Sequence, residues 1–169
     1  TGLRVGIATI QALALVHQRS IVQVSTLAAF AYGVNDSLET VAEKEQMIGV
    51  WMDGQRGEVF SVLYKSPQNA KSTGLVGSEK TVVTPPNLEL LEEHAVGQPE
   101  DIATRWVTTF GLTKIRLTGN GVQRYLKAWE NTGIVPEIVP EPASLAPAIG
   151  QLAGQAESDA IISPHAIRP

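Results

Sequence analysis

The feature that most limits how this chain can fold is an apolar segment near its beginning, residues 3–16. Only Arg4, Thr9 and Gln11 are polar within it. Such a segment predicts a helix that other parts of a protein cover on most of its sides. It is shorter than the ~20 residues that a membrane-spanning helix requires, and no small-residue cleavage site follows it. We therefore expect neither a membrane anchor nor a signal peptide.

The helical repeat divides this segment into two apolar stripes. The first stripe is formed by larger apolar residues together with one alanine, and it consists of Leu3, Ile7, Ile10 and Ala14. The adjoining stripe holds mostly small residues, which let another backbone approach closely, and it consists of Gly2, Gly6, Thr9 and Leu13. We expect one stripe to cover a sheet of the helix's own lobe and another surface to remain for a partner.

Arg4 is unusual because a cation in the first turn of a helix opposes the helix dipole unless an anion compensates for it. One interpretation is an ion pair with a partner, with Gln11 as a polar neighbour on the same face. The alternative is a solvated arginine at the end of the chain. The partner interface that we predict on this helix consists of Leu3, Arg4, Ile7, Ala8, Ile10, Gln11 and Ala14.

The composition excludes several functions. The 169 residues are 43% hydrophobic and 18% charged, which is typical of a globular protein. The net charge is −4 and the basic residues are scattered, so we expect no direct binding to nucleic acid. The absence of cysteine excludes disulfides and thiolate metal sites and favours a cytoplasmic location.

The pattern of the chain predicts two parts. Residues 21–24 are expected to form a strand, and Ser25 or Thr26 to begin a second apolar helix that ends near Gly33 or Asn35. A polar segment over residues 35–45 then resembles a linker. We therefore divide the chain into residues 1–45, the remainder of an N-terminal lobe with its linker, and residues 46–169, a C-terminal lobe.

The C-terminal lobe is predicted to be α/β, with a mixed sheet flanked by helices. Residues 47–52 and 58–64 read as a β-hairpin and residues 80–83 as a third strand. Thr84, Pro85 and Pro86 predict the start of a helix whose apolar side is Leu88, Leu90 and Leu91. Further helices are expected at 100–110, 122–129 and 144–156, and strands at 114–117 and 134–139. This order suits a ribonuclease-H-like lobe.

Two short segments are candidates for phosphate chemistry. Asp53 ends the first strand of the lobe, where a metal-binding carboxylate would need further acids, and only Glu58 is near in sequence. The alternative is that Asp53 forms a turn by accepting nearby backbone N–H groups. The turn of Gly119, Asn120 and Gly121 before a helix could cradle a phosphate or could simply be a tight turn.

Other catalytic arrangements are not supported. His17, His94 and His165 are far apart, and none has a second metal ligand at helical spacing. They are interpreted as helix-end or surface residues. The serines and threonines show no nucleophile elbow and no paired histidine, so protease activity is not expected.

Several segments together resemble one family. They are TGLRVGIATIQALAL, IVQVSTL, DGQRGEVF, and TGNG followed by Tyr125, and their order and spacing are similar to those of the bacterial TsaB (YeaZ) proteins. The resemblance implies an actin-like (ASKHA) fold of two ribonuclease-H-like lobes in which nucleotide binding has degenerated. It also implies a non-catalytic partner of TsaD in forming tRNA N6-threonylcarbamoyladenosine, together with the ATPase TsaE and without a cofactor. The first helix would bind TsaD, or a second copy when TsaD is absent.

The chain also departs from this family. Where the family usually has DARxGEVY, this chain has Gly54, Gln55 and Phe60, so any role of the lost charge and hydroxyl is in doubt. The first strands of the family and its final Tyr-Leu-Arg stretch are not found, so we expect an incomplete N-terminal lobe and a chain truncated at both ends. The resemblance leaves a candidate vestigial ligand site at Asp53, Arg56, Glu58, Gly119, Asn120 and Gly121. The alternative function is a phosphate- or nucleotide-handling enzyme that uses Asp53 and this glycine turn.

Overall fold

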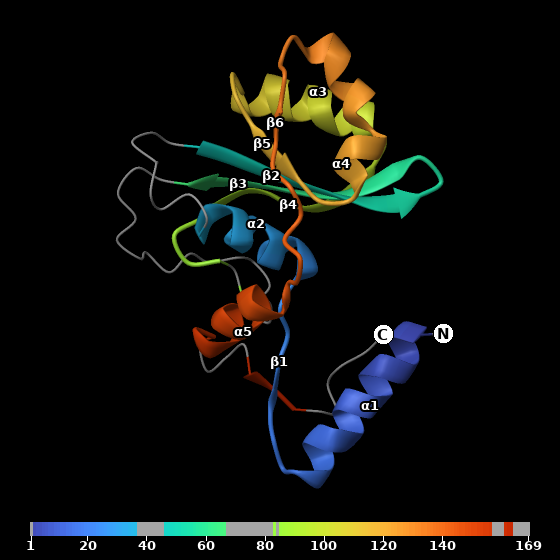
Figure 1. Ribbon diagram of the computed structural model, residues 1–169, viewed down its shortest axis with the longest axis vertical. Helices are drawn as coiled ribbons and strands as arrows, with labels where there is room; N and C mark the ends of the chain where they lie inside the picture. The colour runs from blue at the N-terminus through green and yellow to red at the C-terminus, as the bar shows by residue number, and fades with distance from the viewer. Residues whose placement is uncertain (1, 37–45, 67–82, 84, 157–160, 164–169) are drawn as a thin grey trace.

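The protein is built around a mixed five-stranded sheet, which lies in the upper part of the computed structural model (Figure 1). The structure describes residues 2–36, 46–66, 83, 85–156 and 161–163. The strands, in the order in which they lie in the sheet, are β4 (Glu89–Gly97), β3 (Glu58–Ser66), β2 (Gln46–Gln55), β5 (Arg116–Thr118) and β6 (Glu137–Ile138). β2 pairs antiparallel with β3 and β3 with β4, whereas β5 pairs parallel with both β2 and β6. The predicted α/β fold with a mixed sheet is confirmed.

The alternation of side chains along β2 gives the sheet two buried faces. On one face, Ile48 and Val50 pack against Leu27 and Phe30 of α2 (Thr26–Asp36). The opposite face is covered by α3 (Pro99–Phe110), α4 (Gly121–Arg124) and the 3₁₀-helix η1 (Leu126–Thr132). Because both faces are covered, the central strands consist largely of apolar residues.

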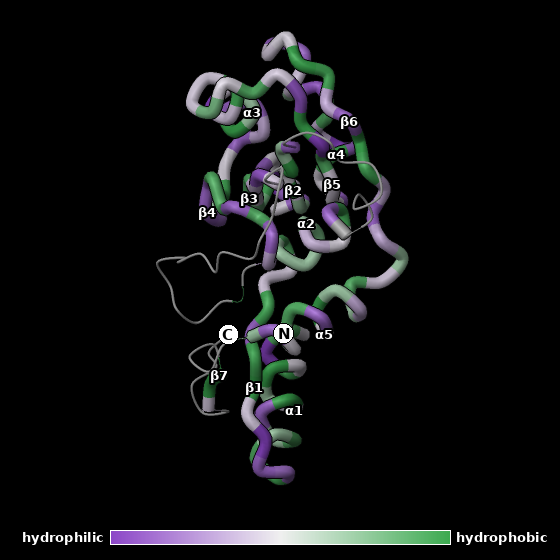
Figure 2. The backbone as a smooth tube through the Cα atoms, turned by 90° about the vertical axis from the view of Figure 1, so that its left-hand side faces the viewer, coloured by the Kyte–Doolittle hydropathy of each residue, from purple (hydrophilic) through white to green (hydrophobic). Residues whose placement is uncertain are grey.

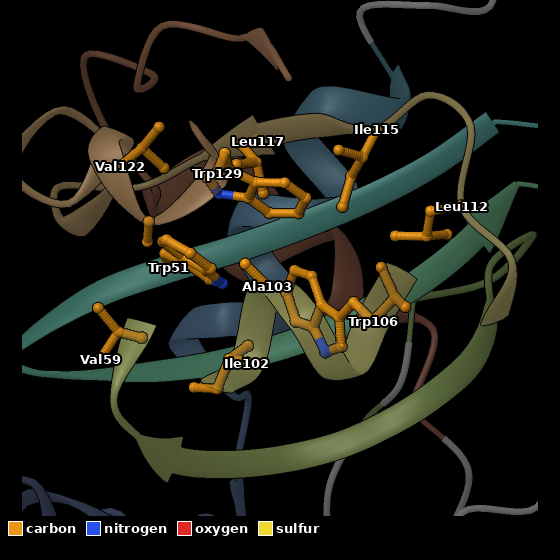
Figure 3. Packing of buried hydrophobic residues seen from close by; sticks show 12 residues of the cluster. Trp51, Val59, Ile102, Ala103, Trp106, Leu112, Ile115, Leu117, Val122 and Trp129 are labelled. Atoms are coloured by element: carbon orange, nitrogen blue, oxygen red, sulfur yellow. The ribbon is translucent and has the colours of Figure 1, made fainter. Parts of the chain in front are cut away.

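Three tryptophans form the centre of the second face. Trp51, Trp106 and Trp129 come from β2, α3 and η1, and their ring centroids lie 5.5–6.3 Å apart. Figure 3 shows these rings with Leu117 and Ile115 packed around them. A side chain at Gly49 would come within 2.6 Å of both Trp106 and Leu117. The close packing of Trp106 and Leu117 therefore requires a glycine at position 49 of β2.

The lower part of the molecule is more loosely built. α5 (Ala146–Gly154) packs against the side of α2 through Ala148 and Leu152, which lie with Ala29 in one small core. β1 (Ile21–Val22) pairs antiparallel with β7 (Ile161–Ile162) in a separate two-stranded sheet. α1 (Gly2–Val16) is a long helix that stands in the lower part of the molecule, apart from the five-stranded sheet (Figure 1). Within the described residues, no helix combines the length and hydropathy needed to cross a membrane.

One predicted helix is wrong. The segment after Pro85 and Pro86, with Leu88, Leu90 and Leu91, does not form a helix, because β4 begins at Glu89 and pairs along β3. Its prolines lie instead in a turn, in which the Leu88 N–H donates to the Pro85 carbonyl at 3.4 Å and Asn87 has a φ of 66°. The leucines fit a strand as well as one side of a helix, which short apolar runs cannot distinguish.

Other predicted elements are present with changed bounds. The helix expected at residues 122–129 is broken at Tyr125 into α4 and η1. The strand expected at residues 134–139 is reduced to Glu137–Ile138. Of the strand expected at residues 80–83, only Val83 is described, and it forms a single parallel bridge with Val24.

The predicted division at residue 45 stays a prediction, because the linker residues 37–45 lie outside the described residues. Several contacts nevertheless join the two predicted parts, two of which involve whole elements. α2 packs on the sheet, and β7 pairs with β1.

Candidate functional site

α1 exposes most of its apolar surface. Leu3 is 72% exposed, Ile10 is 52% exposed and Val16 is 78% exposed, and Ala14 is the one buried residue of the helix. Figure 2 shows hydrophobic residues along its length. This amount of uncovered apolar side chain is unusual for a helix that only contacts solvent.

The predicted interface residues lie mostly on the open surface. Gly2, Leu3, Gly6, Ile7 and Ile10 line a shallow apolar depression along α1. Arg4 and Ala8 are exposed, and Ile7 and Gln11 are half-buried. Their role in binding stays a prediction. The sequence stripes did not include Val5 and Val16, which are 61% and 78% exposed, so the apolar surface of α1 is wider than expected.

Asp53 lies at the end of β2 and is held by four neighbours. Its Oδ1 accepts hydrogen bonds from the Gln55 N–H at 2.9 Å and from the Tyr125 hydroxyl at 3.0 Å. Its Oδ2 accepts one from Nη1 of Arg124 at 2.7 Å, and its own N–H donates to Oδ1 of Asn120 at 2.8 Å. The Arg124 guanidinium also lies over the Tyr125 ring, 5.6 Å from its centroid. The cluster therefore ties β2 to the turn before α4 and to α4 itself.

These contacts shift the ionisation of both groups. The backbone N–H of Gln55 lowers the pKa of the Asp53 carboxyl, and Tyr125 and Arg124 lower it further against the opposing effect of desolvation. Desolvation and the bond to Asp53 raise the pKa of the Tyr125 phenol. Asp53 is thus kept as a carboxylate and is bonded to the protein through both of its oxygens. This agrees with the interpretation of Asp53 as a turn-forming residue.

The glycine turn packs directly on β2. Gly119 has a φ of 106°, and a side chain there would collide with the Trp51 carbonyl. A side chain at Gly121 would come within 3.0 Å of the Asp53 nitrogen. Close packing therefore explains both glycines without a ligand. α4 has four residues, so the turn does not lead into a long helix.

The structure brings together some of the predicted ligand residues. Asp53, Asn120 and Gly121 meet, whereas Arg56 lies exposed at the tip of the β2–β3 hairpin and Glu58 begins β3 opposite Gln55. Among the described residues, no group of three or more histidine or acidic side chains is placed to hold a metal ion. Whether the turn binds phosphate stays a prediction.

Sequence reasoning missed two sets of contacts. Arg124 and Tyr125 contact Asp53 across 71 and 72 residues of sequence. The expectation that no serine pairs with a histidine is wrong, because Ser25 Oγ lies 2.9 Å from His94 Nε2, 69 residues away. Ser25 also caps α2, since its Oγ accepts the Ala28 N–H at 3.4 Å. This pair therefore connects β4 to the start of α2.

The chain was compared with protein families and with curated proteins. The family model described as TsaD, tRNA N6-adenosine threonylcarbamoyltransferase, matches residues 1–93, more than half of the 169 residues. A comparison with curated proteins gave no significant match.

Two solved structures show the same fold. The structure of YeaZ from Pseudomonas aeruginosa aligns with a TM-score of 0.65 and 24% identity, covering 100% of this chain and 68% of that one. A second structure is described as an uncharacterized protein with similarity to the peptidase YeaZ from Pseudomonas aeruginosa. It aligns with a TM-score of 0.61 and 22% identity, and the alignment covers 66% of that protein's chain. These similarities confirm the actin-like, ribonuclease-H-like fold expected from the resemblance to TsaB (YeaZ).

Proposed function

Because this chain belongs to the family of the tRNA N6-adenosine threonylcarbamoyltransferase TsaD, we propose that it serves tRNA modification as a non-catalytic subunit that binds a TsaD-type enzyme through α1. The observation that supports this proposal is the exposed apolar surface of α1. A TsaE-type ATPase would join through the complex. Without a TsaD-type partner, the same surface would form a homodimer.

The energetics of α1 favour a protein partner. Burying a large aliphatic side chain that is otherwise exposed contributes roughly 1.5–3 kcal/mol. Leu3 and Ile10 together border the depression, and Gly2 and Gly6 within it let a partner helix approach closely. Arg4, exposed in the first turn of α1, would be stabilised by a carboxylate of the partner. We therefore expect the partner to offer an apolar helix with an acidic residue near Arg4.

Co-purification with a TsaD-type protein tests this proposal. The variant Ile7→Glu places a charge in the depression, and we expect it to abolish co-purification, because an unpaired charge in an interface costs several kcal/mol. Ala12→Glu is the matched control, since Ala12 is exposed and lies outside the depression. Both variants should retain the circular dichroism spectrum of the parent. Undiminished co-purification of Ile7→Glu would refute this interface.

The alternative function is a phosphate-handling enzyme that uses Asp53 and the Gly119–Gly121 turn. The contact between Asp53 and Asn120 brings these two segments together. The bonds from Arg124 and Tyr125 to the Asp53 carboxylate weigh against it, because a metal ion that holds a phosphate would need those oxygens as ligands. Calorimetry with ATP and Mg²⁺ separates the two functions. Micromolar binding that Asp53→Asn weakens would favour the enzyme.

A further inference from the structure

The tip of the β2–β3 hairpin has an unusual backbone for its sequence. Gln55 pairs with Glu58, so Arg56 and Gly57 form a two-residue turn. Gln55, Arg56 and Gly57 all have positive φ, at 63°, 52° and 86°. Turns of this kind favour Asn, Asp or Gly at the first central position, because other side chains are strained there. The hairpin therefore carries a strained arginine at the position where an unstrained residue would be expected.

The two non-glycine residues with this strained backbone lie at the surface. Gln55 and Arg56 are exposed, and among the described residues Arg56 takes part in no ion pair. Figure 1 shows that the β2–β3 hairpin extends beyond the helices that cover the sheet. No contact within the described part of the chain accounts for an arginine at this position, although the strain lowers the stability of the fold. Strain of this kind, when it persists at an exposed site, points to recognition.

The base of the hairpin is held rigidly. Asp53 fixes it through the Gln55 N–H and through Arg124 and Tyr125. Arg124 is 62% exposed, and its described hydrogen bond uses only Nη1. An arginine already positioned by a carboxylate and an aromatic ring loses little freedom when its other edge binds a second anion. Two arginines are thus exposed here, Arg56 at the tip of the hairpin and Arg124 of α4, which bonds to Asp53 at its base.

We propose that the tip of the β2–β3 hairpin, with Arg56 at its apex and Arg124 near its base, is an interaction surface that binds a carboxylate-rich surface of a partner protein. The surface is separate from α1 and does not depend on the function proposed for that helix. Two arginines on a chain of net charge −4 are too few to follow a phosphate backbone, which favours a protein over a nucleic acid. A projecting hairpin also suits a concave acidic site.

The test is the binding of a fluorescently labelled hexaglutamate peptide, measured by anisotropy at low salt. We expect Arg56→Glu to weaken binding by about tenfold or more, because it replaces attraction with repulsion. The control Lys114→Glu also removes an exposed cation, two residues before β5 begins, and should change the affinity by less than about twofold. No binding by the parent, or equal losses in the two variants, would overturn the proposal.

A second variant separates recognition from folding. Arg56→Asn suits positive φ, so it should raise the Tm by about 2–4 °C while still weakening peptide binding. A gain in Tm with unchanged affinity would overturn the proposal, because the strained arginine would then have no role in binding. Unlabelled tRNA serves as competitor. Tighter, Arg56-dependent binding of tRNA than of the peptide would also overturn it, in favour of a nucleic-acid surface.

Discussion

Strand β2 and helix α1 are both rich in apolar residues, yet they lie in opposite environments. Trp51 of β2 is 0% exposed, whereas Leu3 of α1 is 72% exposed. Helices of the same chain cover both faces of the sheet, but within the described residues they leave α1 open on several sides. Apolar residues of β2 therefore stabilise the fold, whereas those of α1 are left uncovered by the described part of the chain.

The largest effect is expected in the tryptophan core. Trp106→Ala removes a fully buried ring that contacts Trp51 and Trp129 and donates its Nε1–H to Glu92. It should lower the free energy of unfolding by about 3–5 kcal/mol. Leu3→Ala on α1 should change it by less than about 0.5 kcal/mol. Urea unfolding followed by circular dichroism measures both, and a comparable loss for Leu3→Ala would show that α1 is part of the cooperative core.

An intermediate effect is expected at the glycine turn. Gly119→Ala places a methyl group against the Trp51 carbonyl at a φ of 106° and should cost about 2–4 kcal/mol. Gly133→Ala is the matched control, because Gly133 also has a positive φ, of 73°, but has no atom within 4 Å of the added carbon. It should cost about 1 kcal/mol. Equal losses of stability for the two variants in thermal unfolding would show that backbone strain, rather than packing on β2, is the reason for a glycine at position 119.

A smaller, pH-dependent effect is expected where α3 meets β4. Arg105 donates to both oxygens of Glu92 at 2.9 and 2.7 Å, and Trp106 Nε1 donates at 2.8 Å. Burial raises the pKa of the Glu92 carboxyl, but these bonds and the charge of Arg105 outweigh that effect and hold the pKa below its usual value. The stabilisation is therefore complete above the usual carboxyl pKa and is lost as the pH falls through the lowered value.

The variant Glu92→Gln tests this effect. At neutral pH it should cost about 1–2 kcal/mol, a range that allows for the 44% exposure of the Arg105 side chain. The difference from the parent should shrink when unfolding is repeated near about pH 3. Glu130→Gln, an exposed change in η1, provides the control and should be neutral at both pH values. A Glu92→Gln deficit that stays constant with pH would contradict the role of the charge.

The sequence predicted features that depend on local periodicity. The helix at residues 2–16, the β2–β3 hairpin and the helix ending before Gly111 follow from patterns within single segments. β4 was mistaken for a helix because Leu88, Leu90 and Leu91 fit both periods, and only pairing with β3 decides between them.

Contacts between segments that are far apart in the sequence could not be predicted from residue spacing. Asp53 was identified as a candidate from its place at a strand end, but its bonds to Arg124 and Tyr125 depend on how α4 packs on β2. Ser25 and His94 likewise meet only because β4 passes the start of α2. The residues of the site could therefore be proposed from the sequence, while their partners required the fold.

Hydrogen–deuterium exchange of α1 tests the central claim most directly. The backbone amides of residues 2–16 are measured in the chain alone and in the presence of a TsaD-type protein. We predict that exchange across α1 slows by at least about tenfold in the complex, because the exposed apolar surface becomes covered and local opening is suppressed. A stable complex in which α1 exchanges at the same rate as in the free chain would contradict the claim that this helix is the binding surface.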